Sequence, residues 1–218
     1  MTEQAQLSLL IDKGASEDQF TDFVGELARN GLRAEIVRRP QDGPYASLDW
    51  LIPTGIILLV AKPYYETMLK KMAEDHYLLL KKAAAKLWHK FFGKKPEIER
   101  YVFLFDGRVK ESIFSRGFSI KSATLEGTKI TMLFLNDTPA EDFELGIEEF
   151  MKLMANHYES GGTDPLSEML NAPTRRPPKT WEQLVYFDSA SKEIDLIDYV
   201  TSAKSGKLVS EKIRKQSE

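Results

Sequence analysis

Apolar residues recur along the first forty residues at spacings that predict a strand, a helix and a second strand. Leu7–Ile11 is a short apolar run with polar flanks, which is typical of a buried strand. Ser16 and Gln19 form a capping-box pattern, and apolar residues then recur at helical spacing over residues 20–27. Residues 33–39 alternate between polar and apolar. We therefore expect a β-α-β start whose strands are parallel neighbours, because such crossovers are right-handed within one sheet.

The densest apolar run covers residues 50–61, and its continuation carries tyrosine, methionine and lysine. Its pattern predicts a helix from Thr54 that is kinked or broken near Pro63. A second, amphipathic helix is expected around Trp88, since apolar residues and lysines fall there on two separate helical stripes. We therefore expect residues 54–93 to form a two-helix hairpin.

This apolar run is too short to span a membrane. It has 12 residues, and Pro53 and Gly55 already interrupt it, whereas a membrane-spanning helix needs roughly 20 apolar residues. A longer helix would carry Glu66 and Lys70 into the hydrocarbon at about 2.5–3.5 kcal/mol each at its centre. A membrane span is therefore rejected, and the run is expected either in a core or on an interaction surface.

The second half of the chain predicts strands followed by one long helix. Residues 99–108, 117–127 and 128–136 have the apolar pattern of strands, and the short link between the last two makes them antiparallel. Thr138 is predicted as a helix N-cap with Pro139 at the first helical position and acidic residues in the first turn. This helix is expected to be the last core helix.

A change of composition marks the expected domain boundaries. Residues 160–180 are rich in Gly, Pro, Ser and Arg, which predicts an extended linker with little core of its own. Residues 181–218 hold two short apolar runs, which predict a β-hairpin, and then a frayed tail. The fold class we expect is α+β. Its core domain, residues 1–159, would combine a mixed sheet of five to seven short strands with the inserted helical hairpin.

Composition and charge narrow the class of function. The chain is 42% hydrophobic and 29% charged, an ordinary globular composition. It has no cysteine, which excludes disulfides and thiolate chemistry and fits a cytoplasmic location. Its net charge of −3 argues against nucleic acid as the main partner. Basic residues are nevertheless concentrated in residues 61–100, which carry 10 Lys or Arg against 5 Asp or Glu.

No local motif predicts an enzyme class. His76, His89 and His157 have no metal-ligand spacing, and the sequence has no glycine-rich phosphate loop and no nucleophile elbow. The acidic residues of 141–149 are typical of a solvated face near a helix N-terminus. We therefore expect no catalytic residue, no cofactor and no metal. An enzyme whose site is assembled from distant residues stays an open alternative.

The hairpin at 54–93 is the feature that predicts a function. An apolar face with a lysine rim is typical of a surface that docks on protein. We expect a non-enzymatic interaction or assembly module that uses the hairpin for self-association or for docking on another protein. A peripheral protein that binds anionic lipid through the same lysines is the alternative. The residues predicted to carry the interaction are Ile56, Ile57, Leu59, Tyr64, Lys82, Lys86, Trp88, Lys90 and Phe91.

Overall fold

The computed structural model describes residues 5–11, 16–38, 56–65, 74–91, 114–172, 182–205 and 207–213. Its strands are β1 (Leu7–Ile11), β2 (Ala34–Arg38), β3 (Ile56–Val60), β4 (Phe114–Ala123), β5 (Lys129–Leu135), β6 (Gln183–Asp188), β7 (Glu193–Ile197) and β8 (Ser210–Lys212). They form one mixed eight-stranded sheet in the order β2-β1-β3-β4-β5-β6-β7-β8. The α+β class is confirmed, with more strands than the five to seven expected.

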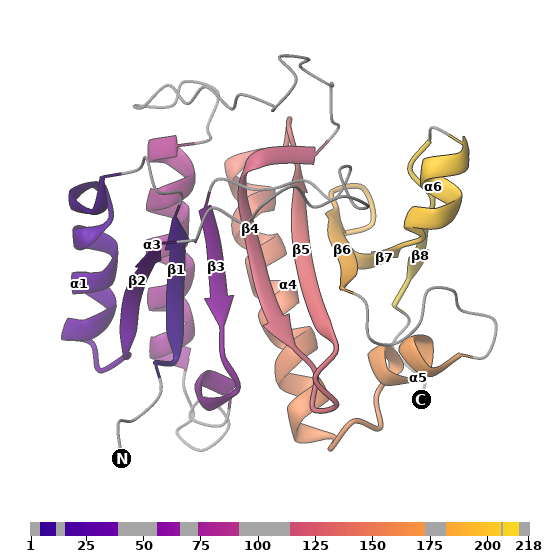
Figure 1. Cartoon of the computed structure of the whole chain (residues 1–218), viewed down its shortest axis with the longest axis horizontal. Coiled ribbons are helices and arrows are strands. Elements are labelled where there is room, and N and C mark those ends of the chain that lie inside the picture. The colour runs from indigo at the N-terminus through magenta and orange to yellow at the C-terminus, as the bar shows by residue number, and fades with distance from the viewer. Residues whose placement is uncertain are drawn as a thin grey trace.

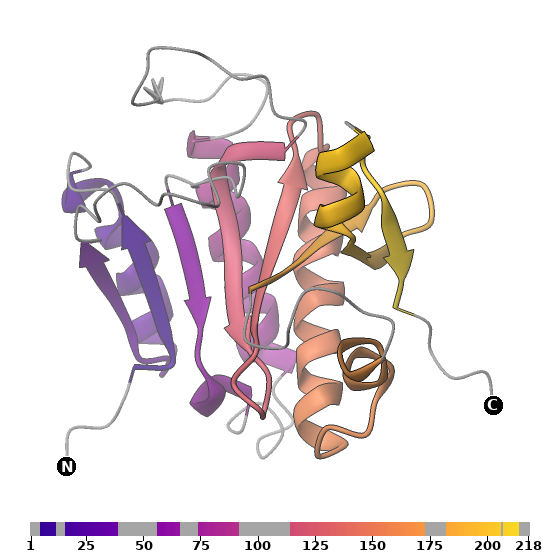
Figure 2. The same ribbon diagram turned by 45° about the vertical axis from the view of Figure 1, so that its right-hand side comes forward.

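Helices cover the two faces of this sheet unequally. They are η1 (Glu17–Gln19), α1 (Thr21–Arg29), α3 (Glu74–Phe91), α4 (Ala140–Glu159), α5 (Pro165–Asn171) and α6 (Tyr199–Ser205). Helices α1, α3 and α4 lie side by side behind the sheet (Figure 1). The turned view places α6 on the opposite side of the sheet from α4 (Figure 2). The main core therefore lies between the sheet and the layer of α1, α3 and α4.

The predicted β-α-β start is confirmed, but its helix begins later than expected. β1 and β2 pair in parallel, with Leu7 opposite Ala34. Ser16 precedes the short η1 helix and makes no side-chain cap bond there. Its hydroxyl contacts the Asp18 carboxylate instead, at 3.5 Å. The α-helix itself begins at Thr21, so the capping box predicted at Ser16 is wrong.

The apolar run expected to begin a helix is a strand, so the two-helix hairpin prediction is wrong. β3 lies inside the sheet, antiparallel to β1 and parallel to β4. Ile56 and Leu58 are fully buried in the main core, and Ile57 between them is only 6% exposed. A strand buried on both faces is apolar at every position, so it lacks the alternation that separates a strand from a buried helix. Residues 66–73 lie outside the described residues.

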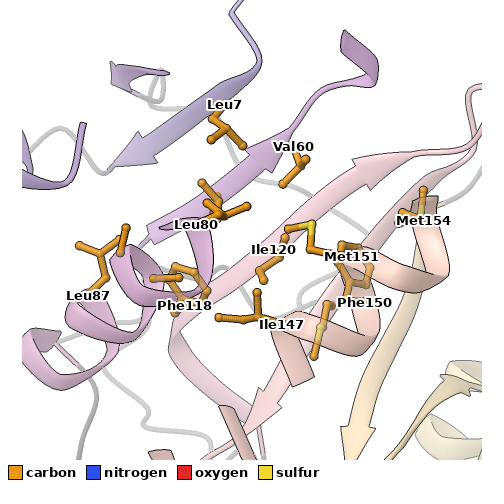
Figure 3. Close-up of a cluster of buried hydrophobic side chains, with 14 of the residues drawn as sticks. Leu7, Val60, Leu80, Leu87, Phe118, Ile120, Ile147, Phe150, Met151 and Met154 are labelled. Atoms are coloured by element: carbon orange, nitrogen blue, oxygen red, sulfur yellow. The ribbon is translucent and has the colours of Figure 1, made fainter. Parts of the chain in front are cut away.

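Aromatic side chains fill the core between α3, α4 and the central strands. Trp88 stacks on Phe143 with ring centroids 4.4 Å apart, and Phe134 lies 4.5 Å from the same ring. The close approach of α4 to the sheet depends on Gly146, where a Cβ would lie 3.0 Å from Met132 Cε. Side chains from the strands and from both helices point toward one another in this region (Figure 3).

The second half of the chain matches the sequence pattern in part. β4 and β5 are antiparallel, as expected. Helix α4 begins at Ala140 with Pro139 as its cap residue, so the prediction of Thr138 as the N-cap is wrong by one residue. Acidic residues do occupy its first turn. The strand predicted at 99–108 lies outside the described residues.

The C-terminal region continues the sheet. β6 and β7 form the antiparallel hairpin that was expected. The linker prediction is wrong over α5, because the Asp164 side chain caps this helix and Leu166 is buried in the main core. β8 and α6 were not expected; Val200 of α6 and Leu208 pack against a second core on the other face of the sheet. Residues 173–181 and 214–218 lie outside the described residues.

Candidate functional site

The residues predicted to carry an interaction divide by burial. Four apolar or aromatic members, Ile56, Ile57, Tyr64 and Trp88, are buried, with Trp88 only 3% exposed. Leu59 is half-buried. Phe91 ends α3, and its side chain lies outside the described part of the chain. Burial also raises the pKa of the Tyr64 hydroxyl, which keeps it un-ionised. The described apolar residues of the predicted surface therefore lie largely in the core.

Two of the three predicted lysines of α3, Lys86 and Lys90, contact neighbouring elements. Lys86 Nζ donates to the Glu26 carboxylate of α1 at 2.7 Å. Lys90 Nζ donates to the carbonyl oxygen of Gln19 at 2.9 Å. Lys82 is exposed. These contacts join α3 to η1 and α1, and the pair between Lys86 and Glu26 is largely solvated, so it contributes only about 0.2–1 kcal/mol.

Acidic residues of α4 meet α3 from the other side. Lys81 Nζ lies 3.1 Å from Glu148 Oε2, and Lys152 of α4 lies 2.8 Å from the other oxygen of the same carboxylate. Asp142 accepts from Lys192 at 2.5 Å, which together with a hydrogen bond from Ser189 lowers the pKa of its carboxyl. These described acids of α4 form ion pairs within the chain and are only partly exposed.

The solvent side of α3 presents one continuous row of side chains. Leu78, Lys82, Lys86 and His89 follow one another at spacings of four, four and three residues, and all four are exposed. Leu78 is 46% exposed, which is unusual for a large apolar side chain in a helix interior. We refer to these four residues as the outer stripe of α3. It is a basic row with one apolar end.

A second group of residues combines a serine, a histidine and an aspartate. In this His157 cluster, His157 Nδ1 lies 2.8 Å from Asp164 Oδ2 and 3.0 Å from Ser167 Oγ. Ser167 Oγ donates to the same Asp164 oxygen at 2.8 Å. Burial alone would raise the pKa of Asp164, but hydrogen bonds from Ser167 and His157 outweigh it and hold that pKa below its usual value.

The His157 cluster has a structural role, because its geometry is not that of a catalytic triad. A catalytic histidine uses one ring nitrogen for the nucleophile and the other for the aspartate. Here both Asp164 and Ser167 meet Nδ1, while Nε2 accepts the backbone N–H of Leu125 at 3.0 Å. His157 is 0% exposed. The cluster therefore clamps the β4–β5 turn to the end of α4 and the start of α5.

A third group lies on β6, β7 and β8, on the sheet face that α6 partly covers. In this Asp195 cluster, Ser210 Oγ donates to Asp195 Oδ2 at 2.9 Å, and Ser210 Oγ lies 3.3 Å from the Tyr186 hydroxyl. Asp195 is 5% exposed, and its Oδ1 is buried with no hydrogen-bond partner among the described residues. Burial raises the pKa of Asp195, and a hydrogen bond from Ser210 offsets part of that rise.

Among the described residues, no group of three or more His, Asp or Glu side chains is placed to hold a metal ion. No described helix combines the length and apolar character needed to cross a bilayer. Comparisons of the chain with models of protein families, with curated proteins and with solved structures found no match. Support for a function therefore comes from the geometry of the three groups of residues described above.

Neither buried polar cluster was found by sequence reasoning. A local signal did exist for one of them, because Asp164 before Pro165 is a typical start of a short helix. The contact between His157 and the turn at Leu125 has no such signal, since it joins residues 32 positions apart. Asp195 gave no signal either, because an acid in an alternating strand is usually read as solvent-facing.

Proposed function

We propose that the protein is a non-enzymatic assembly module that self-associates through its layer of helices, with the outer stripe of α3 at the contact. The supporting observation is that this stripe joins an exposed leucine to a row of basic side chains. The proposal keeps Lys82 and Lys86 from the predicted surface. It replaces the buried apolar residues of that surface with Leu78.

The partner that fits this stripe is a second copy of the chain. Helix α4 carries six acidic residues and one lysine, whereas α3 carries four lysines and two acidic residues. Both helices lie on the same side of the sheet (Figure 1). A two-fold axis between copies would place each α3 against the partner's α4, and each charge contact would occur twice. Complementary charge of this kind sets orientation and association rate more than affinity, so Leu78 supplies the apolar contact.

Analytical ultracentrifugation of the purified chain tests this proposal. We expect a dimer at low ionic strength that weakens as salt is added, because exposed charges are screened within about 10 Å at 0.1 M salt. Leu78→Glu and Lys82→Glu should each weaken the dimer about tenfold, or about 1.4 kcal/mol. Lys207→Glu is the matched control, because Lys207 is exposed and lies outside the helical layer.

A charge swap distinguishes a specific interface from general charge effects. Glu141 is exposed in the first turn of α4. Lys82→Glu and Glu141→Lys should each associate weakly alone, and a mixture of the two should recover a heterodimer. A wild-type chain that is monomeric at every concentration and salt tested would contradict the proposal.

Binding to anionic lipid is the competing outcome. Acidic α4 lies beside α3, where its Glu148 pairs with Lys81, and this acidic neighbour disfavours an anionic surface. Flotation with phosphatidylserine vesicles, released by salt, together with a monomer in ultracentrifugation would favour the lipid alternative over self-association. The cytoplasmic location expected from the absence of cysteine stays a prediction.

A further inference from the structure

Asp195 is placed where its charge state affects the edge of the sheet. It lies in the middle of β7, directly opposite Tyr186 of β6 and Lys212 of β8. Its side chain is 5% exposed, and one carboxyl oxygen has no partner among the described residues. A buried carboxylate with an unsatisfied oxygen is costly, whereas a neutral carboxyl is much less so.

The charged groups around Asp195 do not compensate an ionised form. Asp188 of β6 and Glu193 of β7 face it with like charge, and both raise its pKa. Lys212 of β8 acts in the opposite direction, but its Nζ donates to Glu193 Oε2 at 3.0 Å and so already has an acid partner. Tyr186 is the remaining titratable neighbour, and its hydroxyl contacts Ser210. Among the described residues that face Asp195, Asp188, Glu193 and Asp195 itself therefore share Lys212.

β8 is a short edge strand of the described sheet, and one of the side-chain bonds that hold it is made to Asp195 itself. It has only three residues, Ser210–Lys212, and among the described strands they pair with β7 alone. Beside the Ser210 to Asp195 bond, the Asp198 N–H donates to the carbonyl of Val209 at 2.9 Å, and the Ile213 N–H to that of Ile194 at 3.5 Å. A short edge strand of this kind can detach without unfolding the rest of the sheet.

We propose that β8 is a pH-sensitive clasp, which closes over Asp195 while this carboxyl is neutral and opens when the carboxyl ionises. Opening hydrates the carboxylate and removes the unsatisfied buried oxygen. It also exposes the edge of β7, whose unpaired N–H and C=O groups can accept a strand from another chain. The proposal does not depend on the self-association of the helical layer, because α3 lies on the other face of the sheet.

The sign of the pH dependence follows from the linkage between proton binding and closing. The closed form binds the Asp195 proton more tightly than the open form, since burial raises the pKa. The closed form is therefore most favoured below the ordinary aspartate pKa of about 3.9. This preference weakens as pH rises toward the raised pKa that Asp195 has in the closed form. Each unit of difference in pKa between the two forms changes the closing constant about tenfold.

Amide hydrogen exchange of the full chain tests the clasp. The reporters are the amides of Asp198 and Ile213, because both hydrogen bonds are lost when β8 leaves. The exchange rates of the unfolded sequence divided by the observed rates give protection factors, which are followed from about pH 3.5, below the ordinary aspartate pKa, to about pH 8. We expect protection of both amides to fall as pH rises across this range. The Ala61 amide, bonded to Gln6 at the end of the β1–β3 pair, should not change.

Variants separate the clasp from general effects of pH. Asp195→Asn removes the ionisation and should make protection of both reporters independent of pH. Glu211→Gln is the matched control, because Glu211 is also on β8 but is exposed; it should behave as wild type. Ser210→Ala removes the bond that favours the charged form, so its transition should move to higher pH. Equal pH profiles for wild type and Asp195→Asn would overturn the proposal.

Discussion

The His157 cluster and the Asp195 cluster use the same ingredients with opposite results. Each buries one aspartate beside one serine. Asp164 accepts hydrogen bonds from His157, Ser160 and Ser167 side chains and from the backbone N–H groups of Leu166 and Ser167. Asp195 accepts one described side-chain bond, from Ser210, and keeps one oxygen without a partner.

This difference decides the direction of each pKa. Burial raises the pKa of both carboxyls, but in Asp164 the hydrogen bonds outweigh it and the pKa falls, whereas in Asp195 burial prevails and the pKa rises. Burial by itself therefore does not predict the charge state of a carboxyl. The number of donors that the fold supplies does, and a short helix N-terminus supplies more of them than a strand edge.

The largest expected effect is the contrast between two alanine variants. Asp164→Ala should lower the free energy of unfolding by about 3 kcal/mol, because it removes the cap of α5 and leaves the buried His157 ring without its acceptor. Asp195→Ala should change it by less than about 1 kcal/mol at neutral pH, since a partly unsatisfied carboxyl is lost. Urea unfolding followed by circular dichroism measures both. Equal losses would mean that the two clusters do not differ as their hydrogen bonds indicate.

The pH dependence of stability should have opposite signs for the two aspartates. The pKa of Asp164 is lower in the folded protein than in the unfolded chain, so this residue stabilises the fold at pH values above its unfolded pKa. That stability is lost as pH falls through its folded pKa. The raised pKa of Asp195 has the reverse effect, so stability is lost as pH rises through it. Asp164→Asn should thus destabilise most at neutral pH and least in acid. Asp195→Asn should be more stable than wild type at neutral pH, as unfolding curves at several pH values can check.

How far the sequence predicted these regions depends on the range of the contacts involved. The β-α-β start and the β6–β7 hairpin were predicted because their spacing and turn residues act locally. β3 was mistaken for a helix because a strand buried on both faces has no alternation to read. The α+β class survived this error, since either element would have given the same class.

The two clusters show why the rest could not be predicted. Glu193 and Asp195 alternate with Ile194 and Leu196, and that pattern alone places the two acids on a partly solvated face. The face is buried at Asp195 because β8 and α6 return to it from later in the chain. His157 likewise gains its structural role from its hydrogen bond with Leu125, which lies 32 positions away in the sequence. Tertiary contacts thus decide the role of each polar residue here.

Alanine variants of Ser167 and Ser210 should differ in stability by less than the aspartate variants do. Ser167 Oγ contacts both Asp164 and His157 and is buried, so Ser167→Ala should cost about 1–2 kcal/mol. Ser210 is half-buried on the edge strand, so Ser210→Ala should cost less than about 1 kcal/mol. Thermal and urea unfolding of both variants measure the difference. A larger cost at Ser210 would indicate that β8 is more firmly held than its three residues suggest.

The smallest expected effect tests the neutral state of the His157 ring. Glu126 Oε2 lies 3.8 Å from His157 Nε2, and the Glu126 side chain is 57% exposed. If Nε2 accepts the Leu125 N–H, as their 3.0 Å separation indicates, the ring is neutral and Glu126 has no charge partner there. Glu126→Gln should then change stability by less than about 0.5 kcal/mol at neutral pH, as for a solvated surface charge. Nitrogen chemical shifts of the ring should show a proton on Nδ1 alone. A loss of stability above about 1 kcal/mol in Glu126→Gln, with both ring nitrogens protonated, would mean that His157 is charged and forms an ion pair. The difference between Asp164 and Asp195 would then come from charge and not from hydrogen bonds.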